Sequence, residues 1–110
     1  MTKKSKGNYG EAFCQHYLRA AGYHIWRVNY RIGHKEADIV CLNNRTWVLV
    51  EVKTSRSWQR EWISDQQVEN YHELGMHLQE ILDYPLRFDL FILVLGFGSD
   101  TSFRHELNAF

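Results

Sequence analysis

Two carboxylates and a lysine near the middle of the chain have a spacing that could support hydrolytic chemistry. Twelve residues separate Asp38 from Glu51, and Lys53 follows two positions after Glu51. Val50 and Val52 flank Glu51, and Val52 also precedes Lys53, so both charged residues interrupt an apolar run that is typical of a strand. Because side chains alternate along a strand, Glu51 and Lys53 share one face. Paired carboxylates can bind Mg²⁺ or Mn²⁺, and a neighbouring lysine can stabilise negative charge that develops in a reaction.

Asp38 and Glu51 belong to two expected strands, 36–42 and 46–54, that form a hairpin. A four-residue loop would place Asp38 directly opposite Glu51, whereas a two-residue loop would place Glu36 there and Asp38 diagonally. Either register brings carboxylates together, which costs free energy unless a cation lies between them. A solvated strand face with an Asp, Glu and Lys salt-bridge cluster is the alternative, and spacing alone slightly favours it.

The rest of the chain predicts a sheet with helices on both sides. Residues 87–96 are almost continuously apolar, which suits a strand covered on both faces. We therefore expect an α/β (α+β) fold, a mixed β-sheet flanked by helices, as one domain over residues 1–110. The expected helices are 7–21 and 65–82, the expected strands are 23–31, 36–42, 46–54 and 87–96, and a loop at 96–102 leads to the tail.

Composition and charge limit the cellular environments and the binding partners that we expect for this chain. No apolar stretch is long enough to span a membrane, and no apolar run follows the first lysines as it would in a secretory signal. Cys14 and Cys41 have apolar neighbours, so we expect reduced core thiols in a cytoplasmic protein. The net charge of zero is uneven, with +6 over 1–35, +1 over 36–60 and −7 over 61–110. The basic first third could meet a polyanion, although a neutral chain argues against strong non-specific nucleic-acid binding.

The motifs taken together resemble a known family. Asp38 followed by Glu51-Val52-Lys53 is similar to the motif of the PD-(D/E)xK nuclease superfamily. Nearly the whole chain resembles the YraN family of small endonuclease-like proteins. The matching segments are Gly10-Glu11, Tyr17-Leu18, Gly22-Tyr23-His24-Ile25, Asn29-Tyr30-Arg31, Lys35-Glu36-Ala37-Asp38-Ile39-Val40, Val50-Glu51-Val52-Lys53-Thr54, Arg87-Phe88-Asp89 and Asn108-Ala109-Phe110.

The resemblance implies a restriction-endonuclease-like fold related to Holliday-junction resolvases. It implies that Asp38, Glu51 and the carbonyl of Val52 bind Mg²⁺ or Mn²⁺, that Lys53 is the catalytic lysine, and that Glu11 adds a further carboxylate. The implied activity is metal-dependent hydrolysis of DNA phosphodiester bonds, with branched or structured DNA as a candidate substrate. A homodimer is compatible with that class of enzyme.

Further residues are candidates for contact with substrate. Glu36 matches the family motif, and His34 lies at the mouth of the hairpin. Gln67 and Tyr71 resemble the Gln-x-x-x-Tyr element of RecB-type nucleases, although a capping box from Ser64 to Gln67 and a core tyrosine also explain them.

The loop after Lys53 departs from the family pattern, because it is rich in tryptophan. Arg56 and Arg60 alternate with Trp58 and Trp62, a combination that could stack on bases or fold back onto the core. Few basic residues follow it. A catalytically weak or inactive module that binds nucleic acid or acts as an adaptor is therefore the alternative to an enzyme.

Overall fold

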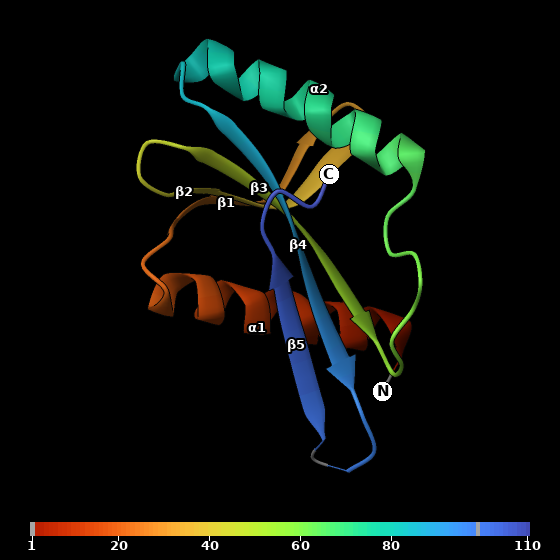
Figure 1. The fold of residues 1–110 in the computed structure, drawn as a ribbon. Helices are drawn as coiled ribbons and strands as arrows, with labels where there is room; N and C mark the ends of the chain where they lie inside the picture. The colour runs from red at the N-terminus through yellow and green to blue at the C-terminus, as the bar shows by residue number, and fades with distance from the viewer. Residues whose placement is uncertain (1, 99) are drawn as a thin grey trace.

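The computed structural model describes residues 2–98 and 100–110. Helix α1 is followed by three strands, helix α2 and two further strands (Figure 1). Their bounds are α1 Lys3–Ala20, β1 His24–Ile32, β2 Lys35–Leu42, β3 Trp47–Ser55, α2 Asp65–Ile81, β4 Leu86–Leu95 and β5 Thr101–Glu106. The expected fold class, a mixed sheet flanked by helices, is confirmed.

The five strands form one sheet in the order β1-β2-β3-β4-β5. β3 and β4 are parallel, and the other neighbours are antiparallel. The parallel pair needs a crossover connection, which the segment containing α2 provides. β3 therefore lies at the centre of the sheet, between the antiparallel hairpin β1-β2 on one side and β4 on the other.

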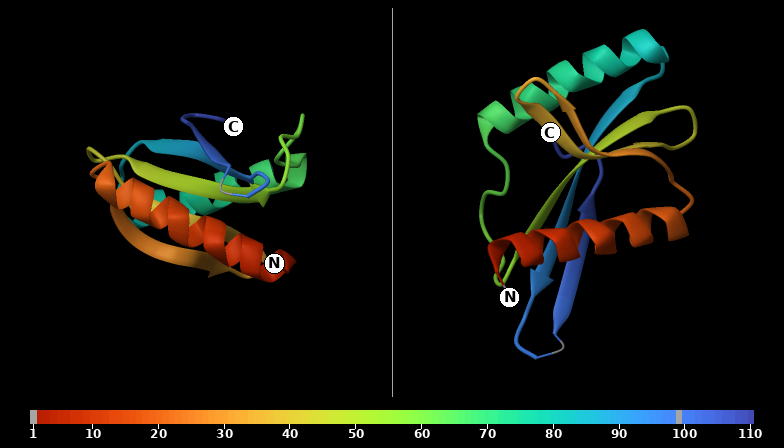
Figure 2. Two further views of the ribbon diagram at one scale, coloured as in Figure 1. Left: turned by 90° about the horizontal axis from the view of Figure 1, so that it is seen from below. Right: turned by 180° about the vertical axis from the view of Figure 1, so that it is seen from behind.

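The two helices cover opposite faces of the sheet, as Figures 1 and 2 show. Alternate residues of the central strands divide between the helices, as the pleat of a strand requires. Cys14 and Leu18 of α1 pack with Val48 and Val50 of β3 on one face. Leu74 and other residues of α2 pack with Trp47 and Leu49 on the other face. The odd positions of β3 thus face α2, and this places Glu51 and Lys53 on the α2 side.

Both ends of the chain differ from the expectation. Helix α1 begins at Lys3 rather than residue 7, because the Thr2 side chain accepts a hydrogen bond from the N–H of Ser5 and caps the helix. The tail contains β5, which the sequence analysis missed. Four of its six residues are exposed, so it lacks the apolar alternation that would mark a strand. Its pairing with β4 defines it instead.

The turn between β2 and β3 is the four-residue form. The N–H of Asn43 donates to the carbonyl of Thr46 and the N–H of Thr46 donates to the carbonyl of Asn43, which closes Leu42 against Trp47. Cys14 and Cys41 are buried and free, as expected. None of the helices in the described ranges combines the length and apolar character that crossing a bilayer requires.

Candidate active site

The site is built where β2 and β3 separate. Their antiparallel pairing runs from Leu42 and Trp47 to Ile39 and Val50, and no further pair follows. Asp38 and Glu51 are the next residues on each strand, so both stand at the opening of the gap. The four-residue turn therefore brings the carboxylates of Asp38 and Glu51 together at the point where β2 and β3 separate.

Tyr71 of α2 holds the gap open. Its hydroxyl accepts a hydrogen bond from the N–H of Asp38 at 3.1 Å and donates one to the carbonyl of Val50 at 3.2 Å. The ring is buried, and burial followed by the charge of Glu51 raises the pKa of this phenol well above its usual range. The hydroxyl therefore remains a donor, and it satisfies main-chain groups at the point where the ladder ends.

Asp38 spans the gap from the other side. Its Oδ2 accepts a hydrogen bond from the N–H of Val52 at 2.8 Å. Because the N–H and C=O of one strand residue point to the same side, the Val52 carbonyl is also directed toward β2 rather than β4. The resemblance assigns this carbonyl to a metal, and its direction suits that role.

Glu51 is an unusual carboxylate because it is buried, with 7% of its surface exposed. Burial, reinforced by Asp38, raises its pKa to about 9, although the charge of Lys53 opposes the shift. Gln67 donates from Nε2 to Oε2 of Glu51 at 3.3 Å. Without a further cation, Glu51 is therefore protonated at neutral pH.

Glu11 reaches the same region from α1 through a close helix–strand contact. A Cβ added at Gly10 would lie 1.8 Å from Oγ1 of Thr54, so only glycine allows α1 to approach β3 this closely. The next residue, Glu11, is half-buried. Burial, and then the charges of Asp38 and Glu36, raise its pKa. Gly10 thus positions a third carboxylate beside Asp38.

The donor set fits a hard divalent cation in its chemistry. Glu11, Asp38 and Glu51 offer only oxygen atoms, which Mg²⁺ and Mn²⁺ prefer. Asp38 raises the pKa of both other carboxyls, so a cation bound among them would favour their ionised forms. Within residues 2–98 and 100–110, however, no three His, Cys, Asp or Glu side chains form a ready-made metal site. Side chains must rearrange before an ion could be shared by all three.

Lys53 lies on the same face of β3 as Glu51 and is half-buried. Its charge lowers the pKa of Glu51, which indicates that its ammonium group lies near that carboxylate. In the described part of the chain, Lys53 forms no ion pair within 4.0 Å. Its charge is thus available to an anion that enters the site.

The other candidates divide between the site and its surroundings. Gln67 and Tyr71 contact the gap as described above, and Gln67 also completes the capping box with Ser64. The capping box and the buried tyrosine are therefore confirmed, and the likeness to the Gln-x-x-x-Tyr element stays a prediction. Glu36 pairs with Arg31 of β1 on the sheet surface. The remaining candidates, His34, Arg56 and Arg60, are exposed on loops, and no described contact joins them to the carboxylates.

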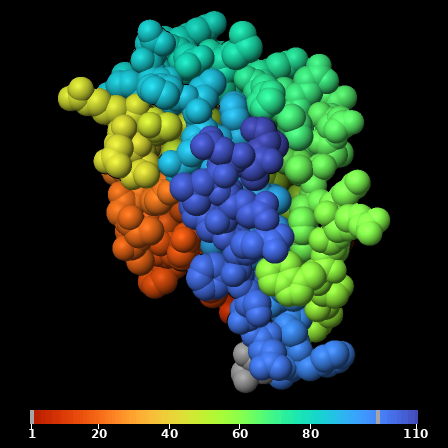
Figure 3. Space-filling view, viewed as in Figure 1, coloured from red at the N-terminus to blue at the C-terminus, as the bar shows by residue number. Residues whose placement is uncertain are grey.

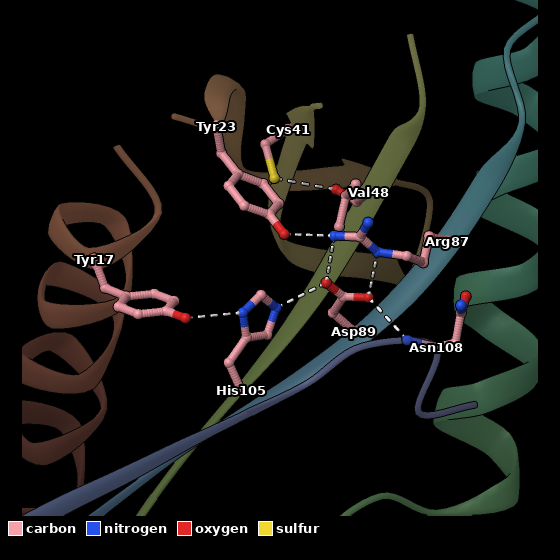
Figure 4. A network of polar contacts seen from close by, with 8 residues as sticks. All are labelled: Tyr17, Tyr23, Cys41, Val48, Arg87, Asp89, His105 and Asn108. Atoms are coloured by element: carbon pink, nitrogen blue, oxygen red, sulfur yellow. Dashed lines mark hydrogen bonds and ion pairs between the residues drawn. The ribbon is translucent and has the colours of Figure 1, made fainter. Parts of the chain in front are cut away.

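A buried network behind the site was missed from the sequence (Figure 4). Asp89 accepts hydrogen bonds from Arg87, from the N–H of Asn108 and from His105, whose Nε2 lies 2.7 Å from Oδ2. Burial alone would raise the pKa of Asp89, but the bonds to His105 and Arg87 hold it below its usual range. Tyr23 accepts a bond from Arg87. The sequence feature that could have revealed this network is Asp89 itself, a charged residue inside an apolar strand.

The Asp89 network supports the site rather than belonging to it. Asp89 pairs with Val50 across β3 and β4, and Val50 packs on the α1 face, opposite the face of Glu51. The network ties β4 to Tyr23, the residue just before β1, to His105 of β5 and to the chain end at Asn108. It fixes the strand that lies beside β3.

Fold and site together define an α+β protein with a five-stranded mixed sheet between two helices and with carboxylates at a split in that sheet. Comparison with known sequences gives the family: the model described as "Uncharacterised protein family UPF0102" matches residues 10–93. The chain belongs to the UPF0102 family, and this confirms the family resemblance.

The relatives have lengths similar to this chain. A UPF0102 protein of Porphyromonas gingivalis is 33% identical over 118 residues, covering 96% of this chain and 83% of the relative. One from Alkaliphilus oremlandii is 33% identical over 117 residues, covering 97% and 98%. One from Desulfitobacterium hafniense is 31% identical over 96 residues, covering 80% and 79%. The printed names of these relatives state the family and no activity.

Proposed function

We propose that this protein is a metal-dependent endonuclease that hydrolyses phosphodiester bonds in branched or otherwise structured DNA. The observation that carries the proposal is the pair of carboxylates at the strand split, with a half-buried lysine on the same face as Glu51. A buried carboxylate with a pKa near 9 is costly in a structural role alone. Perturbed groups of this kind concentrate at functional sites.

Asp38, Glu51, the Val52 carbonyl and Glu11 would hold Mg²⁺ or Mn²⁺. The ion, when bound, would polarise a phosphodiester and lower the pKa of a water molecule. Lys53 would stabilise the negative charge that develops on the phosphate oxygens. Gln67 keeps Glu51 oriented through its hydrogen bond, and Tyr71 keeps the strands apart.

A second candidate is a nucleic-acid-binding or adaptor module with weak or no catalysis. Two observations favour it: the three carboxylates do not form a ready-made metal site within the described ranges, and the chain carries no net charge. The endonuclease and a nucleic-acid-binding module both predict DNA binding, so turnover is the property that separates them. We also propose a cytoplasmic location, because both thiols are free.

The test is cleavage of labelled junction, flap and linear DNA with Mg²⁺ or Mn²⁺ and with EDTA. We expect cleavage that needs the metal and falls by about 10²–10³-fold in Lys53→Ala. Arg19→Ala is the matched control, because it removes the same charge from the exposed last turn of α1. Binding without cleavage would favour the adaptor, and cleavage unchanged in Lys53→Ala would contradict the proposed site.

A further inference from the structure

A cavity of about 490 Å³ opens between the start of α2 and the strands β4 and β5. Arg60 and Trp62, from the loop before α2, line one side of it. Leu90 of β4 and Arg104 and Glu106 of β5 line the other side. Figure 3 shows this loop lying against β5 on the face turned to the viewer. A volume of this size is within the range of small-ligand sites.

Strand register places the cavity beside the carboxylates. Glu51 pairs with Leu90, and Leu90 pairs with Glu106. Residues aligned across neighbouring strands point to the same face, so Glu51, Leu90 and Glu106 form one row. Two strand spacings separate the ends of this row, a distance of about 10 Å. The cavity therefore begins next to the candidate active site.

A second row repeats this arrangement. Lys53 pairs with Ile92, and Ile92 pairs with Arg104. Arg104 therefore lies on the same face as Lys53 and two strands away from it. A DNA strand held at Lys53 would carry its neighbouring nucleotide over β4 toward Arg104.

The rim of the cavity offers flat surfaces. The guanidinium carbon of Arg104 lies 4.8 Å from the centre of the Trp58 ring, and Trp58 is 48% exposed. Trp62 meets Trp58 edge-on, with ring centres 6.3 Å apart. The indole N–H of Trp62 is buried without an acceptor among the described residues, so no hydrogen bond fixes this ring. Aromatic rings and arginine planes of this kind stack on unpaired bases.

The charges around the cavity indicate whether the phosphate or the base of a nucleotide would bind in it. Arg60 and Arg104 are balanced by Glu61, Asp65 and Glu106, so the lining carries a net charge of −1. A phosphate would require a positive lining. A base presents donors and acceptors on its edge, and a lining with both kinds of group can bond to it.

We propose that this cavity receives an unpaired base of the DNA strand whose backbone lies at Glu51 and Lys53. The proposal rests on the proposed function, because that function places a DNA backbone at these residues. A base inside a duplex would first have to leave the stack, which costs free energy, whereas an unpaired base would not. The preferred substrate therefore carries unpaired nucleotides beside the phosphodiester, as a flap, an overhang or a single strand does.

Fluorescence anisotropy in EDTA tests this proposal without any need for cleavage. The probes are a labelled single strand, the matching blunt duplex, and that duplex with a single-stranded overhang. We expect the wild type to bind the single strand and the overhang more tightly than the duplex. Trp58→Ala should weaken binding to the single strand by about 5- to 100-fold and leave duplex binding unchanged. Trp58→Phe should restore most of the loss.

Trp58 contacts two lining residues, Arg104 and Trp62, from the rim of the cavity. Phe97→Ala is the matched control, because Phe97 is an exposed aromatic residue that neither lines the cavity nor stacks on a lining residue in the described chain. It should leave binding to all three probes unchanged. The proposal is overturned if Trp58→Ala and the wild type bind the single strand equally well. It is also overturned if neither protein binds the single strand. Metal-dependent cleavage of junction DNA alongside either result would leave the proposed function standing. Binding that depends on Trp58 without any metal-dependent cleavage would support the cavity and contradict the endonuclease.

Discussion

The main-chain N–H of Val52 donates a hydrogen bond of 2.8 Å to Oδ2 of Asp38, across the gap where β2 and β3 separate. Asp38 therefore serves the fold as well as the candidate site. It satisfies a main-chain donor of the central strand and contributes a carboxylate beside Glu51. These two roles can be separated by substitution.

Asp38→Asn should remain folded, whereas Asp38→Ala should lose stability. Asparagine keeps an oxygen that can accept from Val52, but alanine leaves that N–H without a partner, at a cost of about 1–3 kcal/mol. Both variants should lack metal-dependent cleavage, because neither has the carboxylate. Urea denaturation of the two variants in EDTA checks the difference. Equal stability of the two would show that the hydrogen bond does not support the fold.

Tyr71→Phe should destabilise the protein by about 1–3 kcal/mol, because the N–H of Asp38 and the carbonyl of Val50 both lose their partner. Tyr9→Phe is the matched control, since Tyr9 is 45% exposed and its loss should change stability by at most about 0.5 kcal/mol. Thermal unfolding of both variants measures the difference. A similar effect in the two would remove the bridging role from Tyr71.

Gly10→Ala should disrupt the contact between α1 and β3, because the new methyl group would overlap Oγ1 of Thr54. We expect a loss of about 1–3 kcal/mol in the free energy of unfolding. Thr54→Ala in the same chain removes the overlapping atom and should recover most of that loss. Gly7→Ala meets open space on the same helix and should stabilise it by about 0.5–1 kcal/mol. Failure of Thr54→Ala to rescue would contradict this account of the contact.

These contacts show where sequence reasoning ended. The spacing from Asp38 to Lys53 predicted the shared face and left two loop lengths open, and the structure selects the four-residue form. The spacing could not predict that β2 and β3 separate at Asp38. The hydrogen bond of Tyr71 at this point comes from α2, 33 residues further along the chain. Glycine is unfavourable inside a helix, and the reason for Gly10 appears only through its contact with Thr54, which is distant in the sequence.

The helices and the first four strands were more predictable from the sequence than the edge strand β5 and the Asp89 network. Apolar periodicity marked both helices and four strands, because each packs apolar side chains into or against the core. β5 carries charged and exposed residues, so only its hydrogen bonds to β4 reveal it. The Asp89 network was hidden for a related reason: its members come from β4, from β5, from the residue before β1 and from the chain end, which only the folded chain brings together.

Glu51 predicts a specific pH dependence of stability in the absence of metal. Its pKa rises from 4.5 in the unfolded chain to about 9 in the folded protein, so folding takes up a proton between these values. The contribution of Glu51 to stability is complete below the unfolded pKa and is lost as the pH rises toward the folded pKa. Glu51→Gln cannot ionise and avoids this loss.

Glu51→Gln should therefore be more stable than the wild type at about pH 8, by on the order of 1–3 kcal/mol, and similar to it at about pH 5. Urea denaturation in EDTA at both pH values provides the measurement. A difference that does not change with pH would indicate that Glu51 is already ionised in the folded protein.

Isothermal titration with Mn²⁺ tests the central claim, that Asp38 and Glu51 hold a divalent cation, most directly. Because Glu51 is protonated at neutral pH, binding should release about one proton, seen as a heat that depends on the ionisation enthalpy of the buffer. Affinity should rise with pH up to about 9, and Asp38→Asn should abolish uptake. No uptake by the wild type, or uptake that is unchanged in Asp38→Asn and releases no proton, would contradict the account.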